Sequence, residues 1–126
     1  MDVFSYLIET KGIDLNTFDK KKNYSIEFAI RNFKQNNGDA NILIYLLNQN
    51  GIGVNKQNQY GRTLVHLCCF YINRLPINIF KYLIEINGGN INIKDAMNNT
   101  PLHIAICDFK HGDFKILSYF FYSQSH

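Results

Sequence analysis

Apolar residues recur at intervals of three and four along several short stretches of the chain, separated by segments rich in Asn, Gly and Lys. In one such stretch Ile26, Ile30 and Phe33 would lie along a single face of a helix. The same spacing predicts two sets of helices that alternate along the chain. The first set covers about Tyr24–Lys34, Thr63–Ile72 and Thr100–Phe109, and the second about Asp2–Thr10, Ala40–Asn48, Ile77–Ile86 and Asp113–Ser123.

The predicted helices belong to a unit that repeats. Helices of the second set are followed by Gly12, Gly51 and Gly88, with 39 residues from the first glycine to the second and 37 from the second to the third. Glycine commonly ends a helix. A tyrosine stands six residues before each glycine. After each glycine come an aliphatic residue three positions on, an Asn directly after it, and an Asp or Asn three positions later. Such recurrence of whole blocks is typical of stacked repeats, and the regular tyrosines suggest packing between second helices, not a ligand cage.

The third unit carries a specific motif. Its segment Thr100-Pro101-Leu102-His103-Ile104-Ala105 resembles in full the T-P-L-H-x-A signature of ankyrin repeats. The second unit keeps Thr63 and His66 and has Cys68 in place of alanine, and the first keeps mainly the apolar positions and Ala29. The resemblance covers nearly all of the chain. It implies an all-α fold, a solenoid of stacked helix-turn-helix units with short β-turns.

The length predicts one domain, and the resemblance implies that it is a single ankyrin-repeat domain over residues 1–126. It divides into a partial repeat at 1–11 and repeats at 12–50, 51–87 and 88–126, the last of them incomplete or atypical. Because the spacing exceeds the usual 33 residues of the family, the loops should be longer than normal. Thr63 and Thr100 suit the capping position, and Pro101 suits the first helical turn. The alternative, an unrelated helical bundle, would not repeat whole blocks. The residues of the structural motif are Thr63, His66, Thr100, Pro101, Leu102, His103 and Ala105.

Composition limits the function. The net charge of +3, from 13 basic and 10 acidic residues, is too small to indicate nucleic acid or a membrane as a partner. We find no apolar run of ~18 residues that would predict a membrane-spanning helix, and the first residues lack the basic leader of a signal peptide. Cys68, Cys69 and Cys107 have no framework spacing, which favours free thiols and a cytoplasmic location, with the nucleus as the alternative.

The candidate reactive side chains all have a structural explanation. The resemblance implies that His66 and His103 bond locally around the turn, as opposed to acting in catalysis or metal binding. Cys68 stands where Ala29 and Ala105 stand in the other units, so we expect a small core residue. Neighbouring cysteines on a helix point in different directions, and the set lacks the paired spacing of zinc ligands. With no phosphate-binding loop or nucleophile elbow either, we predict no catalytic residue, no cofactor and no metal.

The family resemblance also implies where a partner would bind, namely the turn tips and the exposed faces of the first helices. Carried over by position, it gives the candidates Lys20, Lys21, Arg31, Tyr60, Arg62, Phe70, Tyr71 and Met97. Aromatic residues and Arg are enriched at interface hot spots, so we expect a partner with apolar groups at the middle repeat and acidic groups toward the N-terminal end. Two alternatives stay open: the lysines are a solvated loop tip, or long loops cover Phe70 and Tyr71 and make them core residues.

These features predict a protein–protein interaction module that binds another protein, and not an enzyme. The alternative is a regulatory or spacer ankyrin segment of a larger enzyme whose catalytic domain lies outside this chain. Direct binding of RNA or DNA is disfavoured because the basic residues are few and local. We further expect that changing Tyr60 and Arg62 together to Ala abolishes partner binding and leaves the melting curve nearly unchanged.

Four aromatic residues stand in a row at Tyr119-Phe120-Phe121-Tyr122. A helix turns only one face toward the preceding repeat, so all four cannot be buried by it. An exposed apolar patch of this kind is a liability in a monomer. We therefore expect either a longer repeat array or self-association through the C-terminal end.

Overall fold

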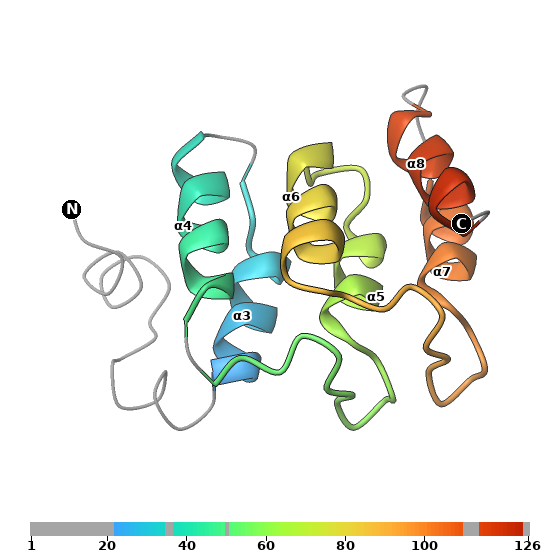
Figure 1. Ribbon diagram of the computed structural model, residues 1–126, viewed down its shortest axis with the longest axis horizontal. Coiled ribbons are helices and arrows are strands. Elements are labelled where there is room, and N and C mark those ends of the chain that lie inside the picture. The colour runs from blue at the N-terminus through green and yellow to red at the C-terminus, as the bar shows by residue number, and fades with distance from the viewer. Residues whose placement is uncertain (1–21, 35–36, 50, 110–113, 125–126) are drawn as a thin grey trace.

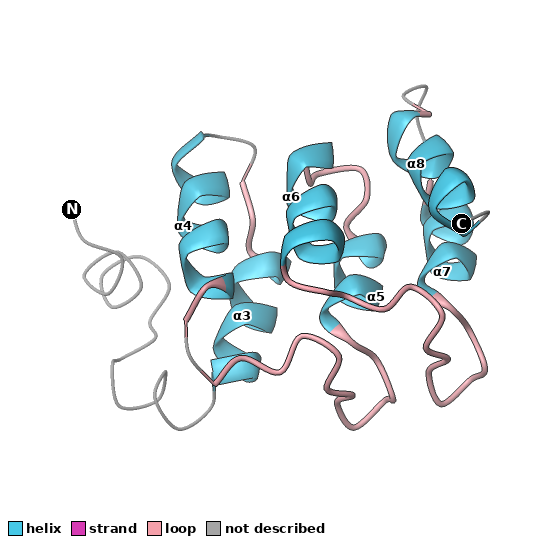
Figure 2. Cartoon of the chain, in the orientation of Figure 1, coloured by secondary structure: helices cyan, strands magenta, loops and turns pink. Residues whose placement is uncertain are grey.

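In the computed structural model, the part of the chain that is described consists of helices joined by loops, without a strand (Figure 2). The described residues are 22–34, 37–49, 51–109 and 114–124. The helices are α3 (Lys22–Arg31), α4 (Asn37–Leu47), α5 (Leu64–Phe70), α6 (Ile77–Lys81) with its π-helical continuation η2 (Tyr82–Ile86), α7 (Pro101–Asp108) and α8 (Lys115–Gln124).

The helices lie in two rows (Figure 1). The first helices of the units form one row, in which α5 packs between α3 and α7. The second helices form the other row, in which α6 packs between α4 and α8. The loops that lead from α4 to α5 and from η2 to α7 project from the same side of the stack (Figure 1). This arrangement places the turns beside one edge of the first helices.

The two clearest repeats begin their first helices as the sequence predicts. Thr63 is the N-cap of α5, and its Oγ1 accepts a hydrogen bond from the His66 N–H at 3.4 Å. Thr100 is the N-cap of α7, and Pro101 occupies the first turn, where its missing N–H leaves no bond unmade. Local sequence therefore sets the point at which each helix starts.

The hydrophobic core lies between the two rows and runs through all three helix pairs. Cys68 is 1 % exposed, which confirms it as a core residue at the alanine position, and Ala105 is fully buried. Leu102 and Ile104 are also buried. The largest fully buried side chains are Ile26, Ile30, Leu43, Leu46, Leu64, His66, Ile79, Phe80, Leu83 and Phe120.

The helix boundaries differ from the predicted ones by a few residues. The first helices of the second and third units end at Phe70 and Asp108, before the predicted ends. The predicted helix 77–86 changes to a π turn at Tyr82, where the Asn87 N–H bonds to the Tyr82 carbonyl at 3.1 Å. The predicted helix 2–10 lies outside the described residues. The division into repeats at 1–11, 12–50, 51–87 and 88–126 stays a prediction.

Two equivalent polar residues shape the projecting turns. Asn58 Oδ1 accepts from the backbone N–H groups of Tyr60 (2.9 Å) and Arg62 (3.1 Å). Asp95 Oδ1 accepts in the same way from Met97 and Asn99, both at 2.9 Å. This explains why Asp or Asn recurs at this position of the repeat.

Tyr82 and Tyr119 each connect neighbouring second helices. The Tyr82 hydroxyl donates to Asn48 Oδ1 at 2.6 Å, and the Tyr119 hydroxyl donates to Glu85 Oε2 at 2.7 Å. Burial and this bond to Glu85 raise the pKa of Tyr119 to about 12. Tyr82 thus links second helices as the regular spacing of the tyrosines suggested, and Tyr119 makes the equivalent bond in the next unit.

Candidate functional site

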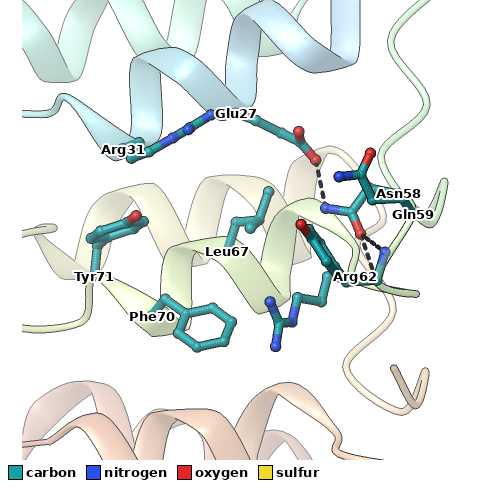
Figure 3. Close-up of a pocket in the computed structure, with 9 residues that line it drawn as sticks. Glu27, Arg31, Asn58, Gln59, Arg62, Leu67, Phe70 and Tyr71 are labelled. Carbon is teal, nitrogen blue, oxygen red and sulfur yellow. Dashed lines mark hydrogen bonds between the residues drawn. The ribbon is translucent and has the colours of Figure 1, made fainter. Parts of the chain in front are cut away.

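A groove lies between α3 and α5, beside the turn that leads into α5 (Figure 3). It encloses about 370 Å³, toward the lower end of the range for ligand-binding pockets. The lining residues are Glu27 and Arg31 from α3, Asn58, Gln59, Tyr60 and Arg62 from the turn, and Leu67, Phe70 and Tyr71 from α5 and its end. Five of the candidates named from the sequence therefore meet in one place.

The floor of the groove is apolar. Phe70 and Tyr71 are half-buried and pack with Leu67 against the core. The loop after α5 covers Tyr71 in part, because the guanidinium of Arg74 lies 4.5 Å from the centre of its ring. The two aromatic residues are thus neither freely exposed nor core residues, which corrects both expectations. Tyr60, at the turn, is 55 % exposed.

Arg62 is held from three sides. Its guanidinium carbon lies 4.5 Å from the centre of the Phe70 ring and 5.3 Å from that of Tyr60. Its Nε lies 3.5 Å from Asp95 Oδ2, and the Arg62 side chain is 25 % exposed. Stacking on aromatic faces and pairing with a carboxylate both restrict a guanidinium. Figure 3 shows the group beside the Phe70 ring.

The carboxylate partner of Arg62 is buried. The Asp95 side chain is 1 % exposed. Burial alone would raise the pKa of this carboxyl, but the N–H groups of Asn99 and Met97 hold its pKa below the usual value. Removal of Arg62 would leave a buried carboxylate without its cation, which destabilises a fold. We therefore revise the expectation for Tyr60→Ala with Arg62→Ala: because Arg62 pairs with buried Asp95, the double change should also lower the melting temperature.

Asn58 joins the turn to the opposite wall of the groove. Its Nδ2 donates to Glu27 Oε1 at 3.0 Å, while its Oδ1 holds the turn (Figure 3). Of the other four lining residues, Gln59 lies at the turn tip where the resemblance places binding residues, whereas sequence reasoning missed Glu27, Asn58 and Leu67. Only Asn58 had a signal, its recurrence as Asp or Asn in each unit.

The remaining interaction candidates lie elsewhere. Met97 is 75 % exposed on the next turn and does not line the groove. Lys20 and Lys21 lie outside the described residues. Asn23, near these lysines at the start of α3, bonds to the loop after α4: its side chain donates to the Gly53 carbonyl at 2.6 Å and accepts from the Gly53 N–H at 2.9 Å.

The motif histidines have structural roles at the turns. His66 is fully buried, and its Nδ1 accepts from the Thr63 N–H at 3.1 Å. Its Nε2 then carries the proton and donates to the Asn99 carbonyl at 2.9 Å. His103 makes the bond equivalent to that between His66 and Thr63: its Nδ1 accepts from the Thr100 N–H at 3.1 Å. The His103 side chain is exposed. These bonds are the local ones that the resemblance implied.

The cysteines do not form a reactive cluster in the part of the chain that is described. Burial raises the pKa of the Cys68 thiol to about 12, and that of Cys69 well above its ordinary value. Such thiols are poor nucleophiles. Cys107 is exposed and free. Among the described residues, no group of three or more His, Cys, Asp or Glu side chains could hold a metal ion.

Comparison with known proteins agrees with the helix stack. A family model of ankyrin repeats, with three copies, matches residues 27–125. No curated protein sequence matches the chain at a significant level. None of the described helices has the length and apolar character needed to cross a membrane. The family match confirms the resemblance of the 100–105 motif and the predicted all-α repeat fold.

Proposed function

The chain belongs to the ankyrin-repeat family, and we propose that it binds another protein through the groove between α3 and α5. Ankyrin repeats are generally protein-interaction modules and are typically non-catalytic. The groove lies at the turns and the first-helix faces. The observation that carries the proposal is the meeting of Tyr60, Arg62 and Phe70 around an apolar floor.

These side chains are suited to an interface centre. Tyr and Arg are among the residue types that most often dominate binding energy. Arg62 and Phe70 lose little freedom on binding, because the guanidinium is already stacked and Phe70 is already half-buried. Tyr60 keeps an exposed ring at the side of the groove. A partner segment can therefore bury apolar area here without first ordering the site.

Site-specific photo-crosslinking tests the proposal without removing a structural side chain. A photoreactive amino acid at Gln59, which is exposed and lines the groove, should capture a protein from a cell extract. The same amino acid at Ile86, 67 % exposed on η2, serves as the matched control. The proposal fails if Ile86 captures the same protein as efficiently, or if Tyr60→Ala leaves capture from position 59 unchanged.

A salt series on the reversible complex, before crosslinking, separates protein binding from nucleic-acid binding. Affinity for nucleic acid falls steeply with salt, because phosphate contacts release counterions. Binding centred on the aromatic floor should change little between 50 and 200 mM salt, a range over which several phosphate contacts lose about 10³-fold or more.

A further inference from the structure

We infer that the groove accepts a protein segment in which a carboxylate side chain neighbours an apolar one, with the carboxylate bound by Arg62. The inference rests on the proposed function and names the chemistry of the partner. The apolar side chain would contact Leu67 and Phe70 on the floor of the groove.

The orientation of Arg62 is the first step. Its Nε edge faces Asp95 Oδ2 at 3.5 Å, and the aromatic rings of Phe70 and Tyr60 lie by its guanidinium carbon. Among the described residues, none accepts a hydrogen bond from its Nη groups. A guanidinium presents donors in a planar fork that matches a carboxylate with two parallel bonds. Within the described part of the chain, the Nη groups are therefore available, on a side chain whose position is already restricted.

The charges around the groove are the second step. Arg31 and Arg62 line it, and Arg74 lies over Tyr71 at its end. The acidic group in the lining is Glu27, which accepts a bond from Asn58 Nδ2. With Asp95, which pairs with Arg62, the three arginines exceed the two carboxylates by one charge, and this excess favours an acidic segment over a basic one.

The size of the groove is the third step. A volume of about 370 Å³ admits a small number of side chains, not an extended polyanion. The carboxylate of Glu27 stands in one wall and would oppose a run of phosphates. A short acidic and apolar protein segment fits both the shape and the charge better than nucleic acid does.

Selection from a peptide library provides the test. A randomised 12-residue library displayed on phage is panned against the full chain, and the selected peptides should contain Asp or Glu within two residues of Leu, Ile, Met or an aromatic residue. In a synthesised binder, changing the acidic residue to its amide should weaken affinity by about 10-fold or more, the effect of losing a charge-assisted hydrogen bond. A peptide with phosphoserine at that position should bind no more tightly than the peptide with the original carboxylate.

Variants of the full chain locate the carboxylate. Arg62→Lys keeps a cation near Asp95 but loses the planar fork. It should lower the affinity for the carboxylate peptide by about 10-fold and change the affinity for the amide peptide little. Lys94→Arg, an exchange of cations at an exposed position outside the groove lining, is the control and should leave both affinities unchanged. If Arg62→Lys lowers the melting temperature, Arg62→Met with Asp95→Asn is used in its place, because it removes both charges together. It should give the same loss of affinity for the carboxylate peptide.

The outcomes separate the two proposals. Groove binding without acidic enrichment, equal affinity for acid and amide peptides, or a preference for the phosphopeptide overturns the carboxylate assignment and leaves the proposed function standing. Peptides that bind Tyr60→Ala and Phe70→Leu chains as tightly as the original chain overturn both, as does a library that yields no binder.

Discussion

The imidazole Nε2 of His66 donates to the backbone carbonyl of Asn99 at 2.9 Å, and the two residues are 33 positions apart in the sequence. The same ring accepts from the Thr63 N–H, so it must be neutral with its proton on Nε2 to make both bonds. One side chain therefore caps α5 and anchors the turn before α7. The bond couples the two repeats that match the family signature best.

This coupling should make the stability depend on pH. Burial lowers the pKa of His66 below its ordinary value of 6.5, although the bond to Asn99 opposes the shift. The unfolded chain then takes up a proton near pH 6.5 while the folded chain does not, so the free energy of unfolding falls as the pH drops below that value. Urea denaturation at pH 7.5 and pH 5.5 measures this. His66→Gln should reduce the difference, and an unchanged difference would show that other groups cause it.

Leu83 should be a critical core position. Its side chain is fully buried, so Leu83→Ala should cost about 2–5 kcal/mol, as do other buried leucines. Neighbouring repeats stabilise each other, and the whole stack should therefore unfold as one unit. Met97→Ala is the control, since Met97 is 75 % exposed, and it should stay within about 0.5 kcal/mol. A loss below about 1 kcal/mol at Leu83 in chemical denaturation would contradict the packing.

Much of the fold could be predicted because its signals are local. Thr63 and Thr100 mark helix starts within a few residues, and the apolar spacing of α3 and α5 identifies the buried faces. The π turn after Lys81 has no comparable signal, because its sequence reads as a continuous helix. The early end of α5 at Phe70 was also missed, since helix ends depend on how the following loop packs.

The groove could be predicted only in part. Tyr60, Arg62 and Phe70 follow from their positions in the repeat, but the partners that hold the groove in shape do not. Asn58 bonds to Glu27 across 31 residues, and Arg62 pairs with Asp95 in the next turn. Contacts between neighbouring repeats depend on how the units stack, which no single segment of sequence reveals. The pairing of Arg62 with Asp95 was missed for this reason.

Gly61 and Gly88 offer a matched test of the turn geometry. Both have positive φ, 74° and 76°, which costs an alanine about 1–2 kcal/mol. An added Cβ at Gly61 would also lie 2.6 Å from the Ala96 backbone nitrogen, whereas at Gly88 it would meet no atom within 4 Å. Gly61→Ala should therefore destabilise the chain by at least about 1 kcal/mol more than Gly88→Ala. Equal melting temperatures for the two variants would mean that the turns do not pack as described.

The C-terminal helix exposes part of its aromatic run, as its sequence predicted. Phe120 is fully buried and makes an edge contact with Phe80 at 5.8 Å between ring centres. Phe121 and Tyr122 are 55 % and 68 % exposed. On α7, Ile106 is 49 % exposed, although Cys69 at the same position of the preceding repeat is fully buried. The side chains of α7 and α8 that correspond to covered positions of the preceding repeat thus form an exposed apolar face, which we call the end face.

We predict that this end face associates with a second copy of the chain. Contacts between identical apolar faces generate twofold dimers, the most common closed assembly. Phe121→Lys together with Ile106→Lys should weaken association by at least about 10-fold, because it places charges in the contact. Ile86→Lys adds one charge at a helical site that is 67 % exposed and lies in η2, outside this face, and it should have no effect. Multi-angle light scattering across a concentration series measures the mass. A monomer at every concentration, or equal dimerisation of all three proteins, would show that the end face does not self-associate.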